Sequence, residues 1–316
     1  MIPARPSQLP IAITMGDPAG IGPEIIAKAF REDPAVTAGC FVVGDMATLR
    51  RASAVVSGPG RPLIPVAGID APQEAYATPP RCIPVLQTPQ RLGPVAVGRV
   101  SAEAGQAAAD CVVWAAQAAL RKEIGAIVTA PLHKEALAAA GISYPGHTEL
   151  LQAQAAAFLG KSVSEVPVRM MLANDELRTV LLSIHVALRD ALDAVTPENL
   201  LETLRITHES VEALLQRAPR IGVAGLNPHA GEGGLFGREE IDTIAPTIET
   251  ARRAGMDVRG PFAPDTVFMR ARAAAGEPGE FDVVIAMYHD QGLIPVKYLG
   301  VDKGVNVTLG LPIRRT

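Results

Sequence analysis

Short apolar runs separated by helix-length segments are the feature of this 316-residue sequence that most limits its fold. Each run is rich in Ile, Val and Ala and stops at a glycine, a proline or a polar residue, which is typical of a strand buried on both faces. The runs occupy residues 11–15, 40–44, 126–130, 221–226 and 283–287. Helical segments lie between them: Ser101 would cap one that runs to about Lys122, and Thr196 followed by Pro197 marks the start of another. This alternation predicts an α/β fold with a mostly parallel sheet.

Composition excludes several classes of function. The chain is 48% hydrophobic and 20% charged, which suits a water-exposed globular protein of two domains or one large one. Its net charge of −4 gives no electrostatic reason to expect a nucleic-acid partner. No secretory signal and no apolar run of about 18 residues is present, so we expect no membrane partner. Cys40, Cys82 and Cys111 lack metal or disulfide spacing, and we expect a reducing cytoplasmic setting.

Three of the six histidines share one context. His185, His229 and His289 each follow an apolar run at the position where the predicted strand ends. Ligands bind beyond the carboxyl ends of strands in open α/β sheets, where residues from neighbouring strands can converge. Three neutral imidazoles would make a catalytic metal site with an open position, although a single strand-end histidine is more often a structural hydrogen-bonding group. Asp290 and Glu232 lie beside two of these histidines and could orient the imidazoles.

Cationic residues near the end of the chain indicate an anion site. Lys297, Arg314 and Arg315 lie between glycine-rich turns in a chain that is acidic overall, and this placement favours recognition of a phosphate or carboxylate over plain surface charge. His147 and Thr148 precede an apolar helical segment, so they lie near a helix N-terminus, where an anion is stabilised. A plain N-cap role for Thr148 is the alternative.

The glycine-rich segment at residues 16–24 has two possible interpretations. Strand, glycine turn and helix follow one another, as in a phosphate cradle. The spacing matches neither a Walker A loop nor a dinucleotide fingerprint, and a tight strand-to-helix turn fits it equally well.

The motifs taken together resemble the 4-hydroxythreonine-4-phosphate dehydrogenase family of pyridoxal phosphate biosynthesis. The resemblance rests on GDPAGIGPE, APLHKEAL, GHTELL, LNPHAGEGG, AMYHDQGLIPVKYLG and GVNVTLGLP, and it runs from Ile11 to Thr316. It implies a fold like that of isocitrate and isopropylmalate dehydrogenases, with two α/β domains and a cleft between them. We expect a cofactor domain at residues 1–128 with 272–316, and a substrate, metal and dimer domain at residues 129–271.

The resemblance also implies the chemistry. The family oxidises a secondary alcohol with NAD or NADP, and the resulting β-keto acid loses CO₂. One divalent metal ion (Zn, Mg or Co) would be held by His185, His229 and His289. The family's other site residues fall on matching positions of this sequence. The substrate, a small phosphorylated hydroxy acid, would contact His147, Thr148, Lys297, Asn306 and Arg315, and Lys297 and Asp265 would serve in proton transfer. The implied assembly is a homodimer with shared active sites.

Two departures from the family pattern concern the C-terminal part. Family members continue past the position of Thr316 with an Asp–His–Gly run and a closing helix, and in related dehydrogenases that region contacts the adenosine end of the cofactor. We therefore assign no cofactor-binding residue. Arg314 stands where the family usually has an apolar residue, beside the substrate residue Arg315.

Other functions compete with this one. Threonate or erythronate 4-phosphate would suit the same site, because these sugar acids differ from the amino acid by one group near the metal. The GHTE motif argues against the branch of the family that oxidises aromatic dihydrodiols. An acyl-phosphate transferase would use glycine loops and arginines but not three strand-end histidines, and a non-catalytic anion-binding protein would not turn over any substrate.

Overall fold

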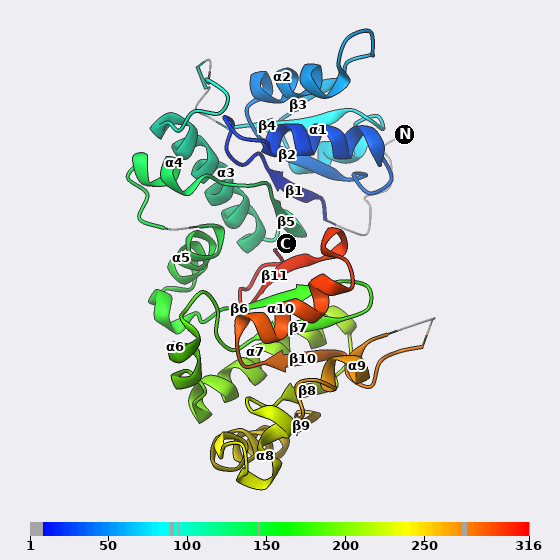
Figure 1. The fold of residues 1–316 in the computed structure, drawn as a ribbon. Helices are drawn as coiled ribbons and strands as arrows, with labels where there is room; N and C mark the ends of the chain where they lie inside the picture. The colour runs from blue at the N-terminus through cyan, green and yellow to red at the C-terminus, as the bar shows by residue number, and fades with distance from the viewer. Residues whose placement is uncertain (1–8, 89–91, 94, 145, 274–276, 316) are drawn as a thin grey trace. The chain divides into compact units, whose positions relative to one another are not determined.

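The computed structural model describes residues 9–88, 92–93, 95–144, 146–273 and 277–315 (Figure 1). These residues form two compact units. Unit 1 runs to Val166 and also contains the C-terminal residues from Leu311 onward, and unit 2 is Pro167–Gly310. Both units are α/β structures with parallel strand pairs, so the expected α/β class is confirmed. Among the described residues, every helix is too short or too polar to span a lipid bilayer.

Unit 1 is built on a parallel five-stranded sheet in the order β3-β4-β2-β1-β5 (Figure 1). The strands are β1 Ile11–Thr14, β2 Cys40–Gly44, β3 Val66–Ile69, β4 Ile83–Gln87 and β5 Ala126–Thr129. The helices are α1 Gly22–Glu32, α2 Met46–Ser57, α3 Ala102–Leu120, α4 Lys134–Ala139 and α5 His147–Leu159, with short 3₁₀ turns at Pro72–Ala77 and Val163–Glu165. Strands β1 and β2 are buried almost completely, as expected for parallel strands covered on both faces.

Unit 2 has a mixed six-stranded sheet in the order β11-β6-β7-β10-β8-β9. The strands are β6 Arg169–Ala173, β7 Arg178–Leu181, β8 Ile221–Ala224, β9 Val258–Phe262, β10 Val283–Ala286 and β11 Val305–Leu309. The helices are α6 Leu188–Asp193, α7 Pro197–Leu215, α8 Ala245–Arg253, α9 Val267–Ala271 and α10 His289–Tyr298, with 3₁₀ turns at Pro228–Gly234 and Val301–Lys303 and a π-helical turn at Glu240–Ile244. The centre, β7-β10-β8-β9, is parallel, whereas β11 and β6 add antiparallel pairs at one edge.

Strand β10 separates two hydrophobic cores of unit 2. Val283 and Ile285 face a core that includes residues of α7 and α8, whereas Val284 and Ala286 face a core that includes residues of α9 and α10. This alternation follows from the two-residue period of a strand. Since helices cover both faces, the sequence of β10 is hydrophobic at every position.

The expected domain boundaries differ from the observed ones at both ends. Residues 129–166 stay with unit 1, because α4 and α5 pack on α3. Residues 272–310 belong to unit 2, because β10 pairs between β7 and β8 and β11 pairs with β6. The chain returns to unit 1 only at its end, where Ile127 donates a backbone hydrogen bond to Arg314 O over 2.9 Å. Strand partners distant in sequence decide these boundaries, and no local pattern reports them.

Side-chain caps fix several helix starts. Ser101 Oγ accepts the N–H of Ala104 at the start of α3, and Thr196 Oγ1 accepts the N–H of Asn199 at the start of α7. Each cap satisfies one of the amide donors that the first helical turn leaves unpaired. The sequence predicted both starts, including Pro197 in the first turn of α7.

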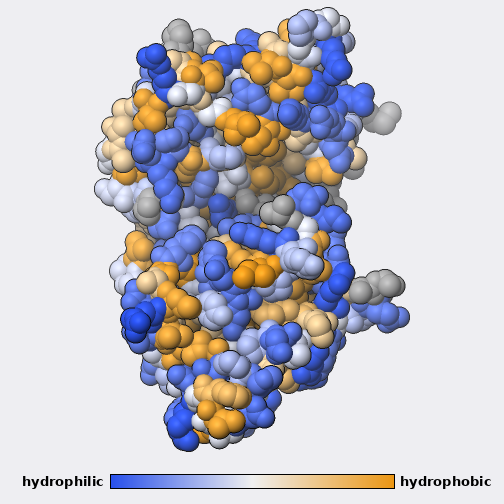
Figure 2. Space-filling view, viewed as in Figure 1, coloured by the Kyte–Doolittle hydropathy of each residue, from blue (hydrophilic) through white to orange (hydrophobic). Residues whose placement is uncertain are grey.

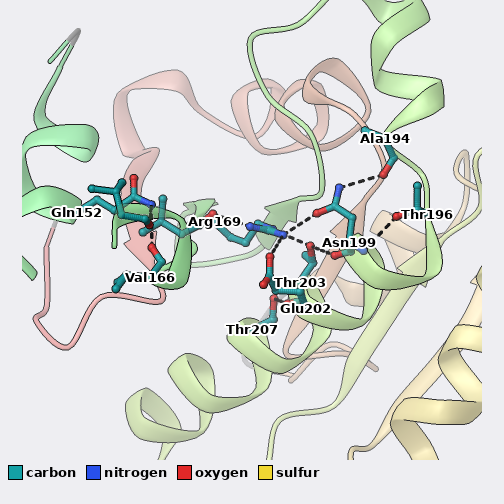
Figure 3. A network of polar contacts seen from close by, with 11 residues as sticks. Gln152, Val166, Arg169, Ala194, Thr196, Asn199, Glu202, Thr203 and Thr207 are labelled. Carbon is teal, nitrogen blue, oxygen red and sulfur yellow. Dashed lines mark hydrogen bonds and ion pairs between the residues drawn. The ribbon is translucent and has the colours of Figure 1, made fainter. Parts of the chain in front are cut away.

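A nearly buried arginine ties α7 to β6 (Figure 3). The Arg169 guanidinium donates to Thr203 Oγ1 over 2.7 Å, to Asn199 Oδ1 over 2.6 Å and to Glu202 Oε2 over 2.9 Å. These acceptors lie along one face of α7 and satisfy a group whose side chain is only 11% exposed. Since β6 pairs with both β7 and β11, this contact fixes the helix over the antiparallel part of the sheet.

Gly105 of α3 marks a close approach to α4 that only glycine allows. An added Cβ would overlap the backbone carbonyl of Ala136. We therefore expect Gly105→Ala to lower the free energy of unfolding by about 1–3 kcal/mol, the usual cost of overpacking, although alanine favours helix formation. Urea denaturation measures this effect. Gln106→Ala, on the exposed face of the same helix, is the matched control, and equal midpoints for the two variants would contradict the packing argument.

Candidate functional site

The three strand-end histidines come from neighbouring parallel strands. His185 follows β7, His289 follows β10 and His229 follows β8, and β10 pairs in parallel with both of the others. The carboxyl ends of β7, β10 and β8 therefore lie at the same edge of the sheet of unit 2. The alternation of strands and helices predicted this arrangement, and the strand order places His289 between the other two along the sheet.

His185 and His289 lie together. Their ring centroids are 5.6 Å apart, and both rings line a pocket of about 310 Å³. The pocket lies within unit 2. Its other lining residues are Ser183, Ile184, Val186, Leu188, Ala191, Tyr288 and Asp290. The walls are largely apolar, so the two imidazoles provide much of its hydrogen-bonding and metal-binding capacity.

Asp290 sets the tautomer of His289. His289 Nδ1 lies 2.6 Å from Asp290 Oδ1, and because an ionised carboxylate can only accept, the ring nitrogen must donate. In the neutral ring this leaves Nε2 with its lone pair available to a ligand. Such a carboxylate–imidazole pair is the usual support of a metal-binding histidine. The sequence predicted this role for Asp290 from its position alone.

His229 lies in a loop with left-handed backbone. Residues 229–234 all have positive φ, including the non-glycine residues His229 (φ 53°), Ala230 (φ 52°) and Glu232 (φ 41°). His185 has φ 49° as well. A left-handed conformation costs a non-glycine residue about 1–2 kcal/mol, so such residues persist where surrounding contacts hold them, and functional sites are where they gather.

The trio does not form one metal-binding group within the chain. Across the part of the sequence that the structure describes, no three His, Cys, Asp or Glu side chains are close enough together to hold a metal ion. The expected convergence therefore applies to His185 and His289 only. Strand order alone does not separate the three histidines, because β10 pairs with β7 and with β8 alike; His229 lies on the left-handed loop that follows β8.

Two polar side chains that the sequence analysis missed cross-link the three strand ends. Ser183 Oγ donates to Met287 O over 2.9 Å and so joins the end of β7 to that of β10. Gln291 accepts the N–H of Met287 over 2.7 Å and donates to Gly225 O over 2.8 Å, which joins β10 to β8. Each lies two residues from a candidate histidine. That spacing is the sequence feature from which a supporting role could have been predicted.

Unit 1 contains a second cluster of predicted site residues. Arg315 donates to Thr129 Oγ1 over 3.0 Å, and His147 Nε2–H donates to Ala130 O over 3.2 Å. Burial and then the positive charge of Arg315 lower the pKa of His147 to about 4, against the opposing effect of the Ala130 bond. His147 is therefore neutral at pH 7, with Nδ1 as its acceptor. Burial also lowers the pKa of Arg315, and the charge of Glu149 opposes this effect.

This cluster lies at the N-terminus of α5. His147 is the first residue of the helix, and Thr148 follows it. The N-cap is Gly146, with no side-chain cap bond, so Thr148 is not the N-cap. A half-buried guanidinium beside a helix N-terminus suits an anion, because both place positive potential at the same point.

The remaining predicted site residues lie in unit 2. Lys297 is exposed in the last turn of α10, Asn306 is exposed on β11, and Asp265 is exposed just before α9. In unit 1, Arg314 is exposed, whereas its neighbour Arg315 is half-buried.

The glycine segment at residues 16–24 forms a tight strand-to-helix turn. Asp17 Oδ1 accepts the N–H of Ala19 over 2.8 Å, and Asp17 N–H donates to Pro131 O over 2.9 Å. Gly16 has φ 72°, and a Cβ there would crowd the carbonyls of Ala130 and Pro131. These contacts account for Gly16 and Asp17 without a ligand.

Comparison with known proteins decides the family. A family model described as pyridoxal phosphate biosynthetic protein PdxA matches residues 37–316. The chain belongs to the PdxA family. It is 50% identical over 307 residues to a 4-hydroxythreonine-4-phosphate dehydrogenase of Beijerinckia indica, covering 97% of this chain and 86% of that protein.

Two further PdxA relatives agree. A D-threonate 4-phosphate dehydrogenase of Salmonella typhimurium is 46% identical over 97% of this chain and 89% of its own length. A crystal structure of 4-hydroxythreonine-4-phosphate dehydrogenase from Klebsiella pneumoniae has a TM-score of 0.85 and 42% identity, covering 98% of this chain and 90% of that one. The relatives are dehydrogenases, so the expected family and enzyme class are confirmed.

The protonation state of His147 is testable. We expect its NMR titration to centre near pH 4, and Arg315→Met to raise the pKa by removing a nearby positive charge. Because the folded-state pKa lies below the ordinary value of about 6.5, the unfolded chain takes up the proton first. The contribution of neutral His147 to stability is thus complete above about pH 6.5 and lost as the pH falls towards 4. His147→Gln assigns the resonance, and a titration centred near 6.5 would refute this account.

Proposed function

We propose that this chain oxidises and decarboxylates 4-hydroxythreonine 4-phosphate to 3-amino-2-oxopropyl phosphate in pyridoxal 5'-phosphate biosynthesis. The observation that carries the proposal is the 50% identity, across 97% of the chain, to a dehydrogenase named for that substrate. The pair of imidazoles in unit 2 and the half-buried Arg315 in unit 1 support it, because the reaction needs a Lewis acid at an alcohol and a cation for an anionic substrate.

The metal part of the proposal rests on the histidine pair. His185 and His289 supply two nitrogen donors at a largely apolar pocket, and Asp290 orients the second of them. A divalent ion bound there would acidify the substrate hydroxyl and then polarise the ketone. Imidazole donors suit Zn²⁺ or Co²⁺ better than Mg²⁺. The donor set fits a metal once a third ligand joins it, and we assign that place to His229.

A homodimer with shared sites would bring His229 to the pair. His229 is exposed, and it lies beside exposed apolar residues, Phe236 at 6.0 Å between ring centroids and Leu235 with 73% of its surface accessible. The pocket that holds His185 also borders apolar surface: Leu188 and Leu192 of α6 are exposed, and Figure 2 shows hydrophobic surface gathered over this helix. Two apolar surfaces that each carry a histidine suit an interface between two copies.

Substrate binding is proposed for the cationic and amide side chains. Arg315, with His147 and Thr148 at the N-terminus of α5, would bind an anionic group of the substrate. Lys297 and Asn306 would supply further donors. Lys297 would also serve as a proton donor, with Asp265 in a proton-transfer role.

The cofactor is proposed to be NAD or NADP, since the relatives are dehydrogenases. The proposal retains the architecture of isocitrate and isopropylmalate dehydrogenases, with a cofactor domain and a substrate domain, and a cytoplasmic location. The second candidate substrate is D-threonate 4-phosphate, because a relative at 46% identity is named for it.

A substrate panel tests the proposal. We expect NADH or NADPH to form with 4-hydroxythreonine 4-phosphate when Zn²⁺, Co²⁺ or Mg²⁺ is supplied, and to cease when the metal is chelated. D-threonate and D-erythronate 4-phosphates are the comparison substrates under the same conditions. Turnover confined to the sugar acids would transfer the chain to the second function, and no turnover of any of the three would refute both.

A further inference from the structure

Glu240 is a buried carboxylate beside the loop that carries His229. Only 3% of the surface of this residue is exposed. It lies on the π-helical turn Glu240–Ile244, which directly precedes α8. Burial of a charge is unfavourable unless hydrogen bonds replace the lost water, so the contacts of this carboxylate indicate its role.

The hydrogen bonds of the Glu240 carboxylate hold the start of the His229 loop. Oε1 accepts the N–H of Leu226 over 2.7 Å and that of Asn227 over 2.8 Å. Oε2 accepts from Asn227 Nδ2 over 3.0 Å. These residues connect the end of β8 to the left-handed turn, so the carboxylate satisfies amides that no longer belong to the sheet.

The left-handed turn also packs closely against the Glu240 carboxylate. A Cβ added to Gly231, in the middle of the turn, would lie 2.7 Å from Glu240 Oε2. A Cβ added to Gly225 would lie 3.0 Å from Oε1 and 3.0 Å from Ala230 Cα. The carboxylate thus fills the inner side of a loop whose non-glycine residues adopt an unfavourable backbone conformation.

The same loop start is joined to the strand that carries His289. Gly225, directly before the two amides that Glu240 holds, accepts the Gln291 amide, and Gln291 also binds Met287. Two side chains therefore hold the start of this loop, Glu240 from the π-helical turn and Gln291 from α10.

We propose that Glu240 is a positioning residue, whose buried carboxylate holds the loop of residues 226–234 in the left-handed turn that presents His229 for metal binding. This inference rests on the proposed function, in which His229 is the third metal ligand. Glu240 itself touches neither metal nor substrate; it acts by fixing the backbone that carries the ligand, as supporting residues around metal ligands do.

Three variants distinguish this positioning role from a general contribution to the stability of the fold. Glu240→Met keeps the length of the side chain and removes both acceptors. Glu240→Gln keeps one oxygen, which can still accept the two backbone amides. Asp242→Asn is the matched control, because Asp242 lies on the same turn, is exposed and pairs with Arg238.

The first measurement uses the metal-free protein. Hydrogen exchange followed by mass spectrometry should show faster exchange of residues 226–236 in Glu240→Met, by about ten-fold or more, with wild-type exchange elsewhere in unit 2. The second measurement is Co²⁺ affinity, followed by absorption spectroscopy and calorimetry. Glu240→Met should weaken Co²⁺ binding roughly 10–100-fold. Glu240→Gln should recover most of the affinity, and Asp242→Asn should match the wild type in both measurements.

The outcomes distinguish the inference from the function on which it rests. Wild-type Co²⁺ affinity or wild-type exchange in Glu240→Met would overturn the inference while leaving the proposed function intact. A wild-type protein that binds no divalent cation would overturn the metal assignment, and the positioning role with it. Should Glu240→Met fail to fold, Gly231→Ala tests the same contact from the loop side, because its Cβ would displace the carboxylate; the same weakening of Co²⁺ binding is expected, and unchanged affinity would overturn the inference.

Discussion

The parallel pairing of β10 with β7 on one side and β8 on the other is the constraint on which the site of unit 2 depends. It brings three chain segments that are distant in sequence to one edge of one sheet, and each segment delivers a histidine there. Ser183 and Gln291 strengthen this arrangement by joining neighbouring strand ends through side-chain hydrogen bonds. Residues of two hydrophobic cores cover β10 on its two faces, so the middle strand of the three is buried at every position.

Local backbone conformation then determines where the side chains lie. His185 and His229 both have left-handed backbone, which is unfavourable for any residue with a Cβ. The structure offsets this cost around His229 with a buried carboxylate and with glycines that allow close approach. In unit 1, burial lowers the pKa of His147, and the charge of Arg315 lowers it further. The imidazole therefore stays neutral and keeps an acceptor nitrogen at Nδ1.

Sequence reasoning could predict the parts of this structure that are encoded locally. Apolar runs predicted β1, β2, β5, β8 and β10 to within a residue or two, and the caps at Ser101 and Thr196 predicted two long helices. The domain boundaries could not be predicted, since they depend on which sheet β10 and β11 join. Nor could the sequence predict that the three histidines do not form one group among the described residues, because no local pattern predicts the left-handed loop that carries His229. The buried position of Glu240 could not be predicted either, because a glutamate at a helix start is ordinarily exposed.

The central claim is that the histidine pair of one protomer is completed by His229 of a second copy, and subunit mixing tests it most directly. His229→Ala and His289→Ala proteins should each be inactive as homodimers. After the two are unfolded and refolded together, a mixed dimer has one site with all three histidines and one site with a single histidine. The account predicts that activity returns to about a quarter of the wild-type value at equal mixing, since half of the dimers are mixed and each has one intact site. If the refolded mixture stays inactive while wild-type protein treated in the same way recovers, the shared site is contradicted.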